Sequence, residues 1–217
     1  MYKTVVFDLD GTLLNTLTDL ADAGNRLCRK YGWPTHERQA YRYFVGNGIP
    51  KLVERLALAD QRTPAVLEAA LADFKRDYGQ HLRDTTAPYP GIPEMLAKLK
   101  ANGVQLAVFS NKADALAKEV VKDYFGTQYF TIVRGQMTGV APKPAAEGTN
   151  ALLQALHADP ASTLYVGDSN VDVETAHNAN LPCCGAVWGF RTREELNAAG
   201  AEYLAENSDE LYDVIMK

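Results

Sequence analysis

The first residues of this chain that could do chemistry are two aspartates, two positions apart, in the stretch TVVFDLDGTLLNT (residues 4–16). Asp8 and Asp10 end an apolar run that is typical of a buried strand, and residues two apart in an extended strand point the same way. Gly11 follows at once and lets the chain turn sharply beside a ligand. Carboxylates this close repel each other unless a cation lies between them. The pair therefore indicates a binding site at the end of the first strand.

Three further polar residues occupy comparable places along the chain. Ser110 ends the apolar run VQLAVFS, Asp168 ends STLYVGD, and Lys143 lies in the loop APKPA. Because ligands of open parallel sheets bind beyond the carboxyl ends of the strands, we expect these residues to converge with the aspartate pair. Oxygen ligands with open positions suit Mg²⁺, and a magnesium ion beside a lysine suits a phosphate group.

Two carboxylates beside a bound phosphate can divide the work of phosphoryl transfer. One can attack phosphorus and form an aspartyl phosphate. The other can protonate the leaving oxygen and later activate water. The residue types at this site therefore predict an enzyme that acts on a phosphoester.

The elements that must position these residues follow from the pattern of apolar runs. Strands are expected at residues 3–9, 104–110, 130–135, 162–168 and 182–188. Helices are expected at residues 90–103, 113–124, 145–157 and 171–180. Near-continuous apolarity indicates strands that are covered on both faces, as in a parallel sheet. The alternation of strand and helix predicts an α/β fold with a doubly wound parallel sheet.

The stretch after the first strand breaks this alternation. Residues 18–31, 49–58 and 66–82 carry helical spacing, and no convincing buried strand lies among them. The Pro-rich stretch APYPGIP then leads back to the strand–helix pattern. We therefore expect a core domain of residues 1–15 and 88–217, with a helical domain of residues 16–87 inserted in it.

Composition limits the possible partners of the chain. The 217 residues carry a net charge of −5 without a block of Lys and Arg, which disfavours nucleic acid. No apolar run approaches the ~20 residues of a membrane span, and no secretion signal is visible. Cys28, Cys183 and Cys184 form an odd set without metal spacing, typical of reduced core residues. We expect a cytoplasmic protein, a monomer or a weak homodimer, with a small-molecule phosphoester as its substrate.

Four stretches together resemble the haloacid dehalogenase superfamily of phosphohydrolases. They are DLDGTLLNT, SNK (residues 110–112), the KP that contains Lys143, and GDSNVD (residues 167–172), and their order and spacing match over nearly the whole chain. The resemblance implies a Rossmann-like core with an α-helical cap domain. Within the superfamily the chain is similar to phosphoglycolate phosphatases, in NTLTDLADAGNRL, VGNGIPKLVERLAL and GAVWGF.

The resemblance implies a role for each acidic residue of these stretches. Asp8 would be the nucleophile and a Mg²⁺ ligand. Asp10 would be the general acid and base, with its main-chain carbonyl on the metal. Asp168 would be the third protein ligand. Asp172, four residues later, would orient the ligands around the metal or Lys143.

The resemblance also implies how the substrate is held. Ser110, Asn111 and Lys143 would bind the phosphoryl group. The loop Gly46, Asn47 and Gly48 would face the rest of the substrate from the cap. Lys51 and Arg55, one helical turn apart, could meet a substrate carboxylate, although exposed helix charges are the simpler interpretation.

The leading interpretation is a Mg²⁺-dependent phosphatase of a small metabolite, with 2-phosphoglycolate as the first candidate. A pyrophosphatase or a sugar phosphomutase of the same superfamily is an alternative. Those mutases usually carry a cap histidine where this chain has Leu20. A phospho-aspartate switch is the non-enzymatic alternative, but bacterial receiver domains are about half this length and carry no helical insert.

Overall fold

The computed structural model describes residues 1–217 and divides into two compact units. The first unit comprises Met1–Leu14 and Pro88–Lys217, and the second comprises Asn15–Ala87. This division falls within one residue of the expected domain boundaries. That the second unit serves as a cap remains a prediction.

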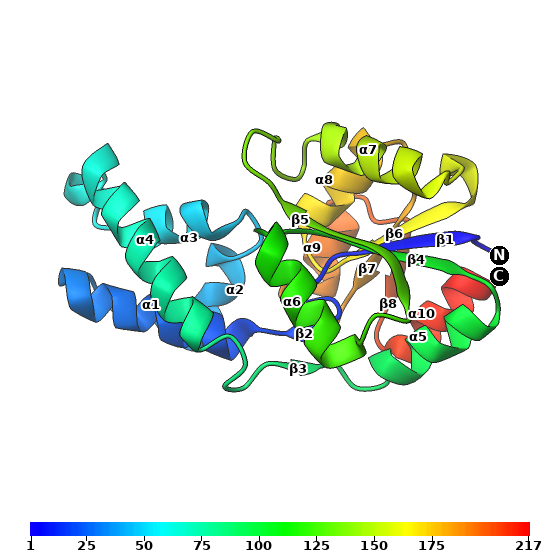
Figure 1. Cartoon of the computed structure of the whole chain (residues 1–217), viewed down its shortest axis with the longest axis horizontal. Helices are drawn as coiled ribbons and strands as arrows, with labels where there is room; N and C mark the ends of the chain where they lie inside the picture. Colours follow the sequence, from blue (N-terminus) through cyan, green and yellow to red (C-terminus); the bar gives the residue numbers. More distant parts are fainter. The chain divides into compact units, whose positions relative to one another are not determined.

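A six-stranded sheet forms the centre of the first unit (Figure 1). Its strands are β1 (Thr4–Phe7), β4 (Gln105–Ala113), β5 (Phe130–Gln136), β6 (Thr163–Gly167), β7 (Cys183–Ala186) and β8 (Tyr203–Ala205). Their order is β5-β4-β1-β6-β7-β8, and every pair is parallel. The doubly wound α/β fold is therefore confirmed.

Strand β1 lies between β4 and β6, and all four of its residues are buried. Its last residue, Phe7, is level with Val108 of β4 and Val166 of β6. The residues that come next in the three chain segments therefore lie side by side. This register brings together residues that are more than a hundred positions apart in the sequence.

Helices cover both faces of the sheet. They are α5 (Ile92–Ala101), α6 (Asp114–Phe125), α7 (Ala146–Leu156), α8 (Asn170–Asn178), α9 (Arg193–Ala198) and α10 (Ser208–Met216). Figure 1 shows α7 and α8 on one side of the strands and α5 and α10 on the other. Val6, Phe109, Tyr165 and Val173 belong to one buried core cluster, which explains the near-continuous apolarity of the strands.

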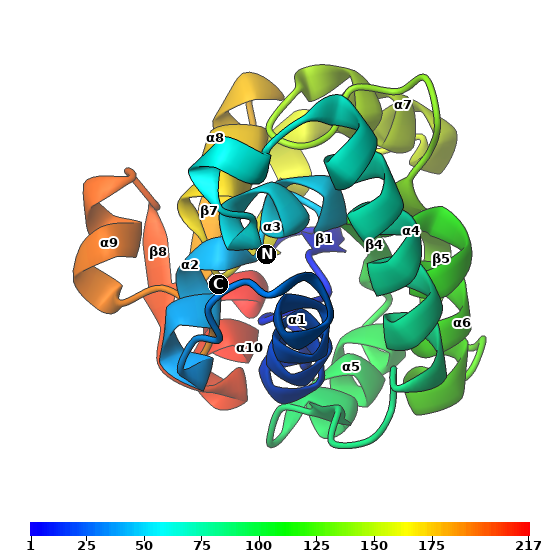
Figure 2. The same cartoon turned by 90° about the vertical axis from the view of Figure 1, so that its left-hand side faces the viewer.

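The second unit is helical. It contains α1 (Leu17–Tyr31), α2 (Tyr41–Phe44), α3 (Ile49–Leu56) and α4 (Pro64–Gln80), with single 3₁₀ turns at Arg38–Ala40 and Ala59–Gln61. Figure 2 shows α1 nearly end-on with the other helices of this unit around it. The two connections to the first unit, β2 (Leu14–Asn15) and β3 (Ala87–Pro88), pair as a two-stranded sheet.

Several elements were absent from the sequence prediction, among them β8, α9 and α10 of the first unit. Strand β8 has three residues and lies at the edge of the sheet, and helix α9 has six residues. Helix α10 is longer, but it packs beside α5, so its partner lies more than a hundred residues away in the sequence. Short edge elements carry too few residues for a periodic pattern to stand out. No helix in the structure has the length and apolarity that crossing a membrane requires.

One buried carboxylate ties the beginning of the second unit to its end. Asp19, 2% exposed in the first turn of α1, accepts hydrogen bonds from the main-chain N–H groups and the hydroxyls of Thr85 and Thr86. These contacts join residues 66 and 67 positions apart. The carboxylate therefore holds the two ends of the insert together.

We predict that Asp19→Ala destabilises the protein by about 1–3 kcal/mol, because buried donors of Thr86 lose their acceptor. Denaturant unfolding of the purified variant measures this loss. The matched control is Asp22→Ala, which removes an exposed carboxylate from the same helix and should change stability little. Equal stability of the two variants would contradict the role of Asp19.

Candidate active site

Three neighbouring strands deliver the polar residues that the sequence singled out. Asp8 directly follows β1, and Asp168 directly follows β6. Ser110 lies within β4, in an irregular stretch between the residues Phe109 and Ala113 that pair with β5. Because β1 lies between the other two strands, these residues meet at the carboxyl end of the sheet, where α/β proteins bind ligands.

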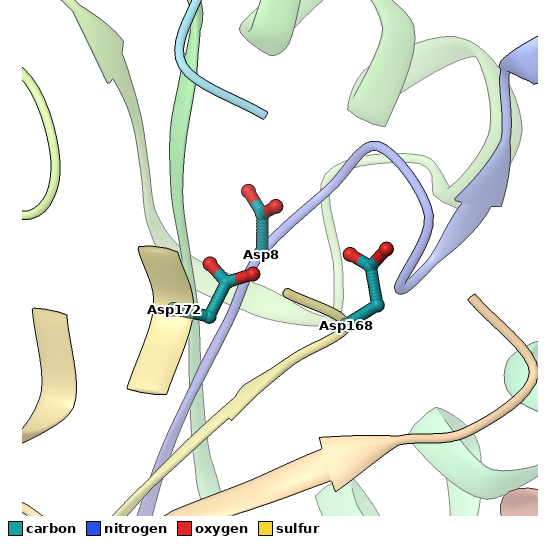
Figure 3. Close-up of side chains that lie close together, drawn as sticks. All are labelled: Asp8, Asp168 and Asp172. Carbon is teal, nitrogen blue, oxygen red and sulfur yellow. The ribbon is translucent and has the colours of Figure 1, made fainter. Parts of the chain in front are cut away.

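The carboxylates of Asp8, Asp168 and Asp172 form a buried cluster (Figure 3). One oxygen atom from each lies within 4.8 Å of the others. Figure 3 shows the three side chains extending to the same side of the strand ends, with Asp172 coming from α8. Gly11 leaves room for this cluster, because a Cβ at this position would lie 2.3 Å from an Asp168 oxygen. Its φ of +90° also favours glycine over other residues.

Lys143 is the cation of this cluster. Its side chain is 2% exposed, and its Nζ lies 2.9 Å from Asp8 Oδ1 and 2.7 Å from Asp172 Oδ1. Burial alone would lower the pKa of Lys143, but the charges of Asp172 and Asp8 outweigh burial and hold this pKa well above its usual value. The side chain is therefore an ammonium ion.

Asp172 is held in place from two directions. Its Oδ2 accepts hydrogen bonds from the main-chain N–H and the hydroxyl of Ser169, which form a capping box at the start of α8. Its Oδ1 accepts from Lys143. Both oxygens of Asp172 are thus engaged, which suits the predicted task of orienting Lys143.

Asp168 is held by the loops around it. Thr12 donates from its hydroxyl to Oδ1 at 3.0 Å, and the N–H of Phe190 donates to Oδ2 at 2.8 Å. Burial raises the pKa of Asp168 well above its ordinary value, and the charges of Asp172 and Asp8 raise it further. An additional positive charge near this carboxylate would favour its ionised form.

Asp8 has the least satisfied carboxylate of the cluster. Although Asp8 Oδ1 is at ion-pair distance from Lys143, no hydrogen bond of good geometry reaches this buried oxygen. Burial raises the pKa of Asp8 to about 6, against the opposing effect of Lys143 and with a contribution from Asp172. An underused buried oxygen beside two further carboxylates fits a hard cation with oxygen ligands. The cluster could therefore hold a metal ion.

Asp10 has a partner that the sequence analysis missed. Lys112 Nζ lies 3.0 Å from Asp10 Oδ1 and 3.3 Å from Oδ2, and the Lys112 side chain is 2% exposed. Lys112 stands in the SNK stretch, so its proximity to the site was visible in the sequence. A lone lysine at a strand end is usually solvated, however, and no periodic pattern shows that this one is buried.

The predicted phosphate-binding residues are also brought together. Ser110 is 3% exposed, and its hydroxyl accepts a hydrogen bond from the N–H of Lys112. The Asn111 side chain contacts the main chain of Lys143 through both of its polar atoms. Ser110, Asn111 and Lys143 therefore occupy one side of the site, and their contact with phosphate remains a prediction.

The loop Gly46, Asn47 and Gly48 belongs to the second unit, where it precedes α3. Arg55 fixes this loop, because its guanidinium donates to the carbonyl of Phe44 at 2.8 Å and to Asn47 Oδ1 at 2.9 Å. The expectation that Arg55 is a simple exposed helix charge was therefore wrong, since the side chain is half-buried and hydrogen-bonded. Lys51 is exposed and pairs with Glu54. Substrate contact by this loop remains a prediction.

Comparisons with known proteins agree with the fold. The model of the family described as haloacid dehalogenase-like hydrolase matches residues 5–186. A phosphoglycolate phosphatase of Chromobacterium violaceum is 32% identical over 217 residues, covering 98% of this chain and 96% of that protein. One of Thiobacillus denitrificans is 31% identical over 191 residues, covering 87% and 84%.

A solved structure matches over the same length. The crystal structure of a protein from Lactobacillus delbrueckii subsp. bulgaricus superposes with a TM-score of 0.93 at 28% sequence identity, covering 99% of this chain and 98% of that one. Family model, relatives and structure thus agree over both units of the chain. The chain belongs to the haloacid dehalogenase-like hydrolase family and is phosphoglycolate phosphatase-like within it.

Proposed function

We propose that the chain is a Mg²⁺-dependent phosphatase that hydrolyses a small phosphorylated metabolite through an aspartyl phosphate on Asp8. The observation that carries this proposal is the buried group of Asp8, Asp168 and Asp172, in which Lys143 pairs with Asp8 and Asp172 and Asp8 keeps an oxygen without a hydrogen bond. The first candidate substrate is 2-phosphoglycolate, because curated relatives over most of the chain are phosphoglycolate phosphatases.

Asp8 would act as the nucleophile in the first half-reaction. Its carboxylate oxygen forms a bond to phosphorus while the bond from phosphorus to the leaving oxygen breaks. Asp10 donates a proton to that leaving oxygen. In the second half-reaction Asp10 takes a proton from water, the water oxygen bonds to phosphorus, and the Asp8 carboxylate is released.

The surroundings of Asp8 support this division of roles. Lys143 is an ammonium ion beside Asp8 and can donate to a phosphoryl oxygen, while Asp172 balances its charge. Ser110, buried within β4, can donate its hydroxyl to another phosphoryl oxygen. Lys112 fixes the Asp10 carboxylate in one orientation through an ion pair.

The proposed metal is Mg²⁺, held by Asp8, Asp168 and the main-chain carbonyl of Asp10. When bound, it neutralises the crowded carboxylates and stabilises negative charge on the phosphoryl oxygens. The oxygen-only donor set of the cluster supports this choice.

The second unit would act as the cap that selects the substrate. Its loop Gly46, Asn47 and Gly48, braced by Arg55, would face the leaving group and help to exclude bulk water. Nothing in this unit favours a sugar phosphomutase, since Leu20, where those mutases carry a histidine, is buried in α1.

A panel of phosphorylated metabolites, assayed with Mg²⁺ and in parallel with EDTA, tests the proposal. We predict hydrolysis with Mg²⁺, a high rank for 2-phosphoglycolate, and loss of activity in EDTA. Ca²⁺ should restore activity poorly, because its larger and looser coordination shell would misplace the attacking group. Full activity in excess EDTA would refute the metal, and inactivity toward every phosphoester would refute the phosphatase.

We predict that Asp8→Asn lowers kcat by at least about three orders of magnitude, because the amide keeps the shape of the side chain but cannot attack phosphorus. Steady-state kinetics of the folded variant measure this loss. The matched control is Asp159→Asn, at the opposite end of β6, which should leave kcat unchanged. A folded Asp8→Asn protein with near-normal turnover would exclude Asp8 as the nucleophile.

Although Asp8→Asn should lower activity, the raised pKa of Asp8 predicts that this substitution stabilises the metal-free protein at neutral pH. The pKa rises from 3.8 to about 6 on folding, so the folded state favours protonated Asp8. The contribution to stability is therefore full below pH ~4 and is lost as the pH rises through about 6, a change of about 1–3 kcal/mol. Asn carries no charge to bury and escapes this loss.

We therefore expect Asp8→Asn, in EDTA, to unfold at a higher denaturant concentration than wild type at pH 7, and at a similar one at pH 4. Denaturant titrations at both pH values measure the difference, in which the acidic groups far from Asp8 cancel. A difference that grows as the pH falls would show that burial does not raise the pKa of Asp8.

A further inference from the structure

The loop that carries Lys143 is fixed to the sheet by a side chain. This loop joins β5 to α7, so the strand ladder does not extend to it. Asn111 of β4 takes the place of a ladder partner. Its Oδ1 accepts from the N–H of Lys143 at 2.8 Å, and its Nδ2 donates to the carbonyl of Lys143 at 3.2 Å.

These two hydrogen bonds determine the direction of the Asn111 side chain. The residue is 8% exposed, and its carboxamide lies against the main chain of Lys143 with both the oxygen and the nitrogen engaged. A carboxamide offers one acceptor oxygen and one donor nitrogen, and here they match one N–H and one C=O. Asn111 thus determines where the Lys143 side chain begins.

A second residue, Tyr165, contacts the ammonium group at the end of the Lys143 side chain. The hydroxyl of Tyr165, in β6, lies 3.2 Å from Lys143 Nζ and donates at 3.3 Å to the carbonyl of Phe109. That carbonyl itself lies 3.3 Å from Lys143 Nζ. Tyr165 is fully buried in the core cluster, so its hydroxyl has a fixed position.

The ammonium group of Lys143 has three N–H bonds and meets acceptors in three directions. One direction leads to Asp172, one to Asp8, and one to the neighbouring oxygens of Tyr165 and Phe109. Contacts in the first and third directions fix the rotation of the ammonium about its bond to the side chain. The side of the ammonium that faces Asp8 Oδ1, 2.9 Å away without a hydrogen bond of good geometry, is then the side that can donate to a bound phosphoryl group.

We propose that Asn111 and Tyr165 are positioning residues for Lys143, Asn111 through the main chain and Tyr165 through the ammonium. The inference rests on the proposed phosphatase function, because it assigns Lys143 to the phosphoryl group. Asn111 then supports phosphate binding through Lys143, not by side-chain contact with the phosphate. When Asp8 becomes an acyl phosphate, the N–H that faced its carboxylate turns to a phosphoryl oxygen while the other two stay in place.

Two single variants test the inference, each made alone and in a Lys143→Met background. Tyr165→Phe removes only the hydroxyl, and Asn111→Ala removes both main-chain hydrogen bonds. The matched control is Tyr41→Phe, which removes the hydroxyl of an equally buried tyrosine that donates to Asn25 at 2.9 Å in the second unit. The measurements are kcat and KM for p-nitrophenyl phosphate, calorimetric affinity for inorganic phosphate with Mg²⁺, and denaturant stability.

We expect Tyr165→Phe to weaken phosphate binding and kcat/KM about three- to tenfold, because the ammonium loses the hydroxyl as an acceptor but keeps the Phe109 carbonyl. Asn111→Ala should weaken both about ten- to a hundredfold, because a small displacement of Lys143 adds to the lost hydrogen bonds. Both effects on phosphate affinity should disappear in the Lys143→Met background. Tyr41→Phe should change stability alone.

Several outcomes would overturn the inference. Wild-type kinetics and phosphate affinity in Tyr165→Phe would refute the role of the hydroxyl, and this isosteric variant carries the test should Asn111→Ala fail to fold. A loss of phosphate affinity in Asn111→Ala that persists in the Lys143→Met background would mean direct contact between Asn111 and phosphate. Failure of the wild type to hydrolyse any phosphoester would refute the proposed function itself, a result distinct from either of these.

Discussion

Three carboxylates and one ammonium group are buried together where β1 and β6 end and α8 begins. Removing so much like charge from water is costly unless opposite charge is supplied, and Lys143 alone leaves the cluster negative. The neighbouring residues hold these charged groups in place despite their excess negative charge. Gly11 leaves room for Asp168, the capping box of α8 holds Asp172, and Asn111 holds the main chain of Lys143. Asp8 has a raised pKa and an oxygen without a hydrogen bond. A cation bound beside it would offset the free-energy cost of burying its charge.

The strand order of the sheet is what makes such a cluster possible. With β1 between β4 and β6, residues near positions 8, 110 and 168 meet without any long side chain reaching across the sheet. The helical unit Asn15–Ala87 is inserted in the chain directly after Asp8 and Asp10 and ends before β4. Asp19 holds the two ends of this insert together. The cap role that we propose for this insert requires a unit with fixed ends, since a loose loop could not present a defined surface to a substrate.

The sequence was sufficient to predict the doubly wound sheet, because each central strand is buried on both faces and is therefore almost wholly apolar. It also indicated which acidic residues would meet, since Asp8 and Asp168 each end such a strand. The contacts that hold the site could not be predicted in this way. Tyr165 looks like any core aromatic, and only the path of the β5–α7 loop brings Lys143 to its hydroxyl. Arg55 looked like a solvated charge, and Lys112 received no role in the sequence analysis. The burial of Lys112 beside Asp10 and the hydrogen bonds of Arg55 to loop carbonyls depend on backbone positions that no periodic pattern encodes.

The central claim is that Asp8 forms a covalent bond to phosphorus, and chemical trapping measures this directly. An acyl phosphate is reduced by borohydride to an alcohol, whereas an ordinary carboxylate is not, so a phosphorylated aspartate becomes homoserine. Protein quenched with borohydride during turnover of a phosphoester with Mg²⁺ should therefore contain homoserine at position 8, detected by mass spectrometry of the N-terminal peptide, and protein quenched without substrate should not. Homoserine at another aspartate, or an unmodified Asp8 in protein that is turning over substrate, would contradict the account.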